Sequence, residues 1–120
     1  MKYQLPLVLL LLILIAGCSE KQPIWFDEFD YNGSPDSTKW SYDMGDGCPD
    51  VCGWGNNEAQ YYTSDTKNVR VENGNLIIEA HKDSLNGKAY TSTRIVSKLK
   101  GDWQYGRIEV KAKLPKGKGT

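Results

Sequence analysis

Residues 69–80 read VRVENGNLIIEA, and this stretch decides the fold class. Apolar and polar residues alternate on both sides of the central Asn-Gly pair, which is the strongest short-range signal for a β-hairpin. A two-residue turn at that pair puts Val71 opposite Leu76. Two residues further out, Val69 faces Ile78. The apolar side chains then lie on one face of both strands, as a half-buried antiparallel pair requires.

Two stretches outside the hairpin also alternate. Residues 107–114 place Ile, Val, Ala and Leu between charged residues, and Pro115 ends the run, so they predict the clearest single strand. Residues 25–30, WFDEFD, predict another. No segment shows a sustained helical period. The sequence therefore predicts an all-β fold of antiparallel strands, part of a β-sandwich.

A second Asn-Gly pair, at residues 86–87, predicts another tight turn. A two-residue turn there places Ile78 opposite Ile95. The same register places Glu79 opposite Arg94, where the two form a cross-strand ion pair. A longer loop shifts this register.

The charge balance excludes one broad class of function. The 120 residues contain 15 Lys and Arg against 15 Asp and Glu, whereas nucleic-acid binders normally carry a basic excess. Seven Tyr and four Trp stand against two Phe. Such residues stack on polar ligands, but they also fill β-strands, and composition alone leaves both open.

The N-terminal residues predict export. Residues 1–17 hold one lysine and then an apolar run, at residues 5–16, that is shorter than the roughly 20 residues of a membrane span. The run ends in Ile-Ala-Gly-Cys18, which resembles the lipoprotein box of bacterial signal peptides. The resemblance implies that Cys18 is lipid-modified and that residues 18–24 form a polar tether. Ser19, in place of a retention aspartate, favours the outer membrane or the cell surface, with the lipid as the only membrane contact.

The two remaining cysteines, Cys48 and Cys52, lie close together in a loop rich in Gly, Asp and Asn. Disulfides persist in exported proteins, so we expect these residues to be bridged. A metal site needs more soft ligands, and the only histidine, His81, is distant in the sequence.

Six separated motifs resemble glycoside hydrolase family 16, and most closely its laminarinase-type endo-β-1,3-glucanases. The resemblance implies a β-jelly roll (concanavalin A-like sandwich) of which residues 25–120 are an N-terminal, incomplete part, since such sandwiches commonly need roughly 200–250 residues. It also implies a monomer for the full-length protein. The motifs are WFDEFD (25–30), KW (39–40), GWGNNEAQYYT (53–63), NVRVENGNLIIEA (68–80), YTSTRI (90–95) and YGRIEVKAKLPKGKGT (105–120).

The resemblance implies retaining hydrolysis of internal β-1,3-glucosidic bonds, without a cofactor, by two carboxyl groups about 5–5.5 Å apart. In the family these come from an E-x-D-x-x-E motif. No such motif occurs in these 120 residues. We expect it beyond Thr120, and therefore expect no hydrolysis by this chain alone.

Trp54, Asn57, Glu58 and Arg94 match positions that line the glycone side of the family's cleft. An aromatic ring beside planar polar groups suits the faces and hydroxyls of a β-glucan. Asn57 alternatively caps its loop, and Arg94 alternatively pairs with Glu79. Tyr61, Tyr62 and Trp103 are either sugar contacts or core.

Many family members hold a structural calcium ion, which takes oxygen ligands. By position, Glu28 and Gly74 match two of those ligands. Two other functions remain open for the chain, a non-catalytic glucan-binding surface lipoprotein and an adhesive domain. Half a jelly roll also leaves an uncovered apolar face, for which the sequence names Val69, Leu76, Ile78 and Ile108.

Overall fold

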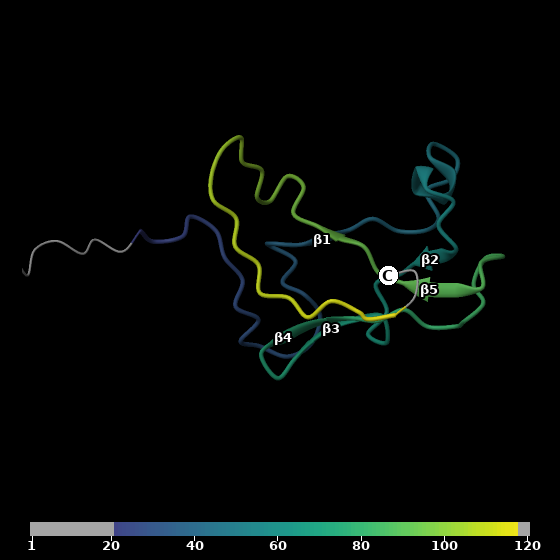
Figure 1. Ribbon diagram of the computed structural model, residues 1–120, viewed down its shortest axis with the longest axis horizontal. Helices are drawn as coiled ribbons and strands as arrows, with labels where there is room; N and C mark the ends of the chain where they lie inside the picture. The colour runs from purple at the N-terminus through teal and green to yellow at the C-terminus, as the bar shows by residue number, and fades with distance from the viewer. Residues whose placement is uncertain (1–20, 118–120) are drawn as a thin grey trace, which may run out of the picture.

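The computed structural model describes residues 21–117, which form three separate two-stranded sheets and one short 3-10 helix (Figure 1). The all-β class is confirmed, and the sheets are incomplete. The pairs are β1 with β6, β2 with β5, and β3 with β4. The elements are β1 (Ser41–Tyr42), η1 (Cys52–Gly55), β2 (Gln60–Tyr62), β3 (Val69–Glu72), β4 (Asn75–Ile78), β5 (Tyr90–Ser92) and β6 (Ile95–Val96).

The β3–β4 hairpin has the predicted register. Val71 pairs with Leu76, and Val69 pairs with Ile78. Both turn residues between the strands have positive φ, 51° and 73°, as a type I′ turn requires. Val69 and Val71 are each 1% exposed, so the expected uncovered face does not include Val69.

The second predicted turn forms, but the register expected beyond it is wrong. Leu85 and Lys88 bridge across the Asn-Gly pair. Further from the turn, His81 bridges Thr91, whereas the register of the Leu85–Lys88 bridge would pair His81 with Ser92. The register therefore shifts by one residue between the two bridges. Ile95 therefore does not face Ile78. It belongs to β6, which pairs with β1, and its partner there is Tyr42.

One of these partnerships is parallel, which the sequence did not predict. Tyr61 of β2 lies beside Thr91 of β5 in a parallel ladder. Buried polar side chains support it: Asn68 accepts a hydrogen bond from the Thr63 hydroxyl (2.7 Å) and donates one to the Thr91 hydroxyl (3.2 Å). Asn68 and Thr91 are both 0% exposed, so the centre of the described fold is partly polar and these polar groups are hydrogen-bonded to each other.

Residues 25–30 do not form the predicted strand. The side chain of Asp27, only 2% exposed, accepts a hydrogen bond from the backbone N–H of Phe29 (3.2 Å), a local turn that competes with extended pairing. Phe29 itself has a φ of 55°, outside the β region. The segment is thus irregular and is anchored by one buried carboxylate.

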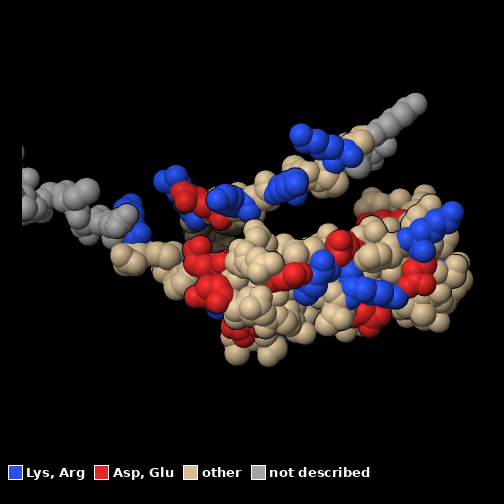
Figure 2. Space-filling model, turned by 90° about the horizontal axis from the view of Figure 1, so that it is seen from below, with Lys and Arg blue, Asp and Glu red and all other residues tan. Residues whose placement is uncertain are grey.

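Residues 102–116 also form no strand, against the prediction for 107–114. A strand needs a neighbour for its backbone hydrogen bonds, and no described segment pairs with this one. Ile108, Val110 and Leu114 are 81%, 80% and 74% exposed. Figure 2 shows the segment standing off the body of the molecule, with Lys and Arg side chains along it.

The predicted signal peptide (1–17) and the lipid attachment at Cys18 lie outside the described residues. Within residues 21–117, no helix has both the length and the apolar character needed to cross a membrane.

Candidate functional site

The candidate site is built on the loop that precedes β2. Cys48 and Cys52 are joined by a disulfide inside this loop. The backbone N–H of Gly53 donates to the carbonyl of Asp46 (2.7 Å), and that of Glu58 donates to the carbonyl of Gly53 (3.1 Å). These cross-links hold the 3-10 helix η1 and the residues after it in one defined path.

The loop follows an unusual backbone path. Trp54 and Asn57 have φ values of 50° and 54°, in the left-handed region that a bulky residue such as tryptophan rarely adopts. Such conformations cost about 1–3 kcal/mol each and persist where the surroundings impose them, often at functional sites. The Trp54 side chain lies against Tyr62 of β2 and against Arg94, the residue just before β6.

Trp54 meets Arg94 at the centre of the site. The guanidinium carbon of Arg94 lies 4.6 Å from the centroid of the indole ring, a cation–π contact. The indole Nε1 donates to the carbonyl of Gly45 (3.3 Å). The Tyr62 ring lies 5.8 Å away at 50°. Trp54 is therefore held at its edge and covered on one face by a cation.

The carboxylate of Glu58 lies beside this aromatic group. Its Oε2 accepts hydrogen bonds from the Tyr62 hydroxyl (2.8 Å) and from Nε2 of Gln60 (2.7 Å). Burial raises the pKa of the Tyr62 phenol above its ordinary value, and the hydrogen bond to Glu58 raises it further. Tyr62 thus stays a donor at neutral pH and orients the carboxylate.

The structure brings three of the four predicted sugar-binding residues together. Arg94 and Trp54 touch, and Glu58 joins them through Tyr62. Asn57 is exposed on the same loop. The alternative pairing of Arg94 with Glu79 is wrong, because Glu79 pairs with Arg70 at 2.5 Å.

Sequence reasoning missed Asp43 and Gln60. Asp43 forms an ion pair with Arg94, with Oδ2 3.1 Å from Nε. Only the β1–β6 register brings Asp43 next to Arg94, and the sequence did not predict that register. Gln60, the first residue of β2, lies two residues after Glu58, and its side-chain Nε2 donates to the Glu58 carboxylate (2.7 Å).

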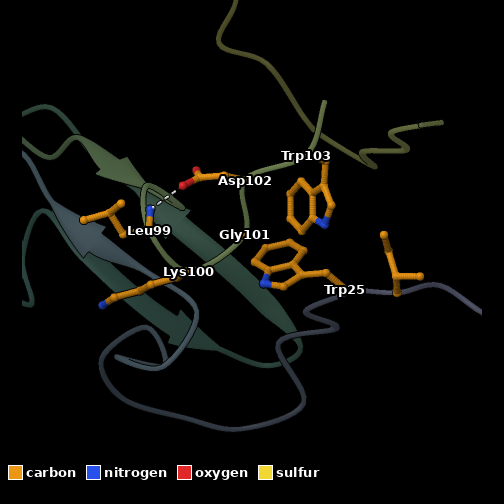
Figure 3. Close-up of a pocket in the computed structure, with 7 residues that line it drawn as sticks. Trp25, Leu99, Lys100, Gly101, Asp102 and Trp103 are labelled. Carbon is orange, nitrogen blue, oxygen red and sulfur yellow. Dashed lines mark hydrogen bonds between the residues drawn. The ribbon is translucent and has the colours of Figure 1, made fainter. Parts of the chain in front are cut away.

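Trp103 packs against Trp25 and not in this site (Figure 3). The two rings lie 5.3 Å apart, edge to face, and line a hollow with Gly101 and Asp102. Trp103 stays 42% exposed. The Nε1 of Trp25 is buried and has no hydrogen-bond partner within residues 21–117.

The predicted calcium ligands are Glu28 and Gly74. Calcium takes six to eight oxygens. Glu28 is exposed, and Gly74 lies in the hairpin turn. No three His, Cys, Asp or Glu side chains of the described residues gather to hold a metal ion. Calcium also binds backbone carbonyl oxygens, so the calcium site stays a prediction.

No family model matches the chain. Comparison with individual known proteins finds relatives that include three named as β-glucan-hydrolysing enzymes. The beta-glucanase of Rhodothermus marinus is 47% identical over 122 residues, covering 92% of this chain and 41% of that protein. The X-ray structure of a laminarinase from the same organism superposes with a TM-score of 0.63 at 52% identity, over 69% of this chain and 32% of that one.

A third relative has a sugar in its site. A mutant of SCLam, a non-specific endo-beta-1,3(4)-glucanase from family GH16, superposes with a TM-score of 0.63 at 43% identity, over 71% of this chain and 36% of that one. It presents a 1,3-beta-D-cellobiosyl-glucose at its active site. This chain therefore spans about a third to two fifths of the relatives that it matches.

All three relatives are β-glucan hydrolases of one fold, and this places the chain among glycoside hydrolases with a jelly-roll architecture. More narrowly, the chain belongs to glycoside hydrolase family 16, in its laminarinase branch.

Proposed function

We propose that the protein to which this chain belongs hydrolyses internal β-1,3-glucosidic bonds of β-glucans with retention. We further propose that the group formed by Trp54, Glu58 and Arg94 binds sugar on the glycone side. The observation that carries the proposal is the cation–π contact of Arg94 on Trp54, whose ring also neighbours Tyr62, the residue that orients the Glu58 carboxylate.

This group has the chemistry that sugar hydroxyls require. The guanidinium of Arg94 carries five N–H donors, of which Nε faces Asp43. Glu58 uses Oε2 for Tyr62 and Gln60, and a carboxylate has a second oxygen to accept a hydroxyl proton. Donors and acceptors on one rigid support can recognise adjacent hydroxyls of a pyranose.

Hydrolysis needs two further carboxyl groups on one strand. The 120 residues contain no E-x-D-x-x-E motif, so we expect the chain alone to bind glucan without cleaving it. In a longer protein, the motif would follow the KGKGT stretch at residues 116–120. Sequencing the gene past Thr120 tests this part of the proposal directly.

The binding proposal is tested by isothermal titration calorimetry of the chain with laminarihexaose, with cellohexaose as the comparator. We expect heat with laminarihexaose at millimolar ligand or below, and a marked loss in the Arg94→Ala and Trp54→Ala variants. Tyr105→Ala is the matched control, because Tyr105 is an aromatic residue that is 86% exposed and lies outside the site. Binding that survives Arg94→Ala, or no heat from the unmodified chain, would contradict the proposal.

The alternative is a glucan-binding surface lipoprotein without catalysis, and one observation supports it: the N-terminal residues end in a lipoprotein-like box at Cys18. Both functions share the proposed location, anchored by lipid at the outer membrane or the cell surface. Metabolic labelling with palmitate should mark the protein and not its Cys18→Ala variant. Glucan cleavage by the full-length gene product decides between the two functions.

A further inference from the structure

Asp43 is fixed directly opposite Arg94. The β1–β6 ladder pairs Tyr42 with Ile95, and the next pair outward is Asp43 with Arg94. The backbone confirms this step, because the N–H of Asp43 donates to the carbonyl of Arg94 (3.0 Å). Directly opposite residues of an antiparallel pair place their side chains on the same face. The carboxylate and the guanidinium are therefore brought together by backbone and side chain alike.

The ion pair engages Arg94 at one end of its guanidinium. Oδ2 of Asp43 lies 3.1 Å from Nε, and the two side chains are 33% and 40% exposed. Because the guanidinium is planar, a contact at Nε also sets the direction in which the two terminal nitrogens point. Those nitrogens carry the four remaining N–H donors.

The same short segment also holds Trp54. Two residues after Asp43, the Gly45 carbonyl accepts from the indole Nε1 of Trp54 (3.3 Å), and Gly45 exchanges two backbone hydrogen bonds of 2.9 Å with Tyr62. Residues 43–45 therefore touch the cation, the indole that it covers and the tyrosine that orients Glu58.

We propose that Asp43 is a positioning residue for glucan recognition, which fixes the guanidinium of Arg94 over Trp54 so that its terminal nitrogens face the sugar. This inference rests on the proposed function, since it concerns the same site. Asp43 acts through Arg94 and needs no contact with the sugar.

The test compares Asp43→Asn with a matched control in the full chain. Asp43→Asn should weaken laminarihexaose binding roughly three- to fivefold while leaving the thermal midpoint unchanged, and Asp43→Glu should restore part of the loss. The control is Asp83→Asn, which removes an ion pair with Lys67 of similar exposure, 42% and 46%, and should leave affinity unchanged. Equal affinities for wild type and Asp43→Asn, or equal losses in both variants, would overturn the proposal.

A second readout separates this inference from the proposed function. In ¹⁵N spectra, the Nε–H of Arg94 should exchange slowly with water in the wild type and quickly in Asp43→Asn. If the chain binds no glucan, the proposed function is refuted, but the exchange rate of the Arg94 Nε–H still shows whether Asp43 holds the guanidinium in place. If the Nε–H signal is the same in both proteins, the positioning role of Asp43 is refuted whether or not glucan binds.

Discussion

The indole Nε1 of Trp40 donates a 2.7 Å hydrogen bond to Oδ2 of Asp27. The same oxygen accepts from the hydroxyl of Tyr31 at 3.1 Å, and Nζ of Lys39 lies 3.5 Å from the other oxygen. One buried carboxylate thus joins the irregular N-terminal segment to the residues just before β1. This replaces the strand pairing that the segment lacks.

Asp27→Leu should therefore destabilise the chain. It removes the acceptor of the part-buried Trp40 and Tyr31 donors, and the loss should stay below the roughly 1–3 kcal/mol that a fully buried unsatisfied donor costs. Urea unfolding followed by tryptophan fluorescence measures the effect. Asp50→Asn, at an exposed loop position, is the control and should shift the midpoint little. Identical midpoints for Asp27→Leu and the wild type would show that this hydrogen-bond group does not support the fold.

The raised pKa of Tyr62 predicts that the chain loses stability in alkaline solution. Its pKa is raised by burial and by Glu58, so the folded state favours the protonated phenol. The resulting stabilisation is complete below the ordinary pKa near 10 and disappears as the pH rises through the folded-state pKa. Unfolding midpoints measured from pH 8 to 11 should fall less steeply for Tyr62→Phe than for the wild type. Parallel curves would rule out this coupling.

The lowered pKa of Glu79 predicts that the chain loses stability in acid solution. The hydrogen bond from Arg70, and then its charge, lower the pKa of this carboxyl below its ordinary value. The stabilisation is present above the unfolded-state pKa and is lost as the pH falls through the folded-state pKa. The midpoint difference between wild type and Glu79→Gln should be larger at pH 7 than at pH 3. Glu109→Gln, in the exposed C-terminal segment, should shift the midpoint at neither pH, and a pH-independent Glu79→Gln difference would contradict the assignment.

The exposed residues of the C-terminal segment predict self-association. Ile108 and Val110 are both at least 80% exposed and lie on a segment with no partner strand among the described residues. Apolar segments of this kind recruit other chains. Light scattering should show the wild type as oligomeric at micromolar concentration. The double variant Ile108→Lys and Val110→Lys should be smaller, with an unchanged thermal midpoint. A monomeric wild type would count against this prediction.

The local features of the fold could be predicted from the sequence, because their determinants lie next to each other in the chain. The Asn73-Gly74 turn and the register around it need only twelve residues of alternation. The segment at 107–114 alternates just as well, yet it forms no strand, because alternation describes two faces and supplies no hydrogen-bonding neighbour. Periodicity therefore predicts which residues are able to form a strand, and pairing decides whether they do.

The site was predictable only in part, for a related reason. Trp54, Glu58 and Arg94 match family motifs, so the resemblance identified them. Asp43 lies in a stretch rich in Gly and Asp, where its neighbours give no indication of a role. Its importance follows from the β1–β6 register, which pairs residues far apart in the sequence.

That long-range pairing also has a consequence for the order of assembly. Closing a large loop costs more chain entropy than closing a tight turn, so the β3–β4 hairpin should form early and β1–β6 late. Arg94 and Asp43 meet only in this last step. The sugar-binding group should accordingly be the first part of the described fold to fray, with amide protons in β1 and β6 that exchange with solvent before those of β3.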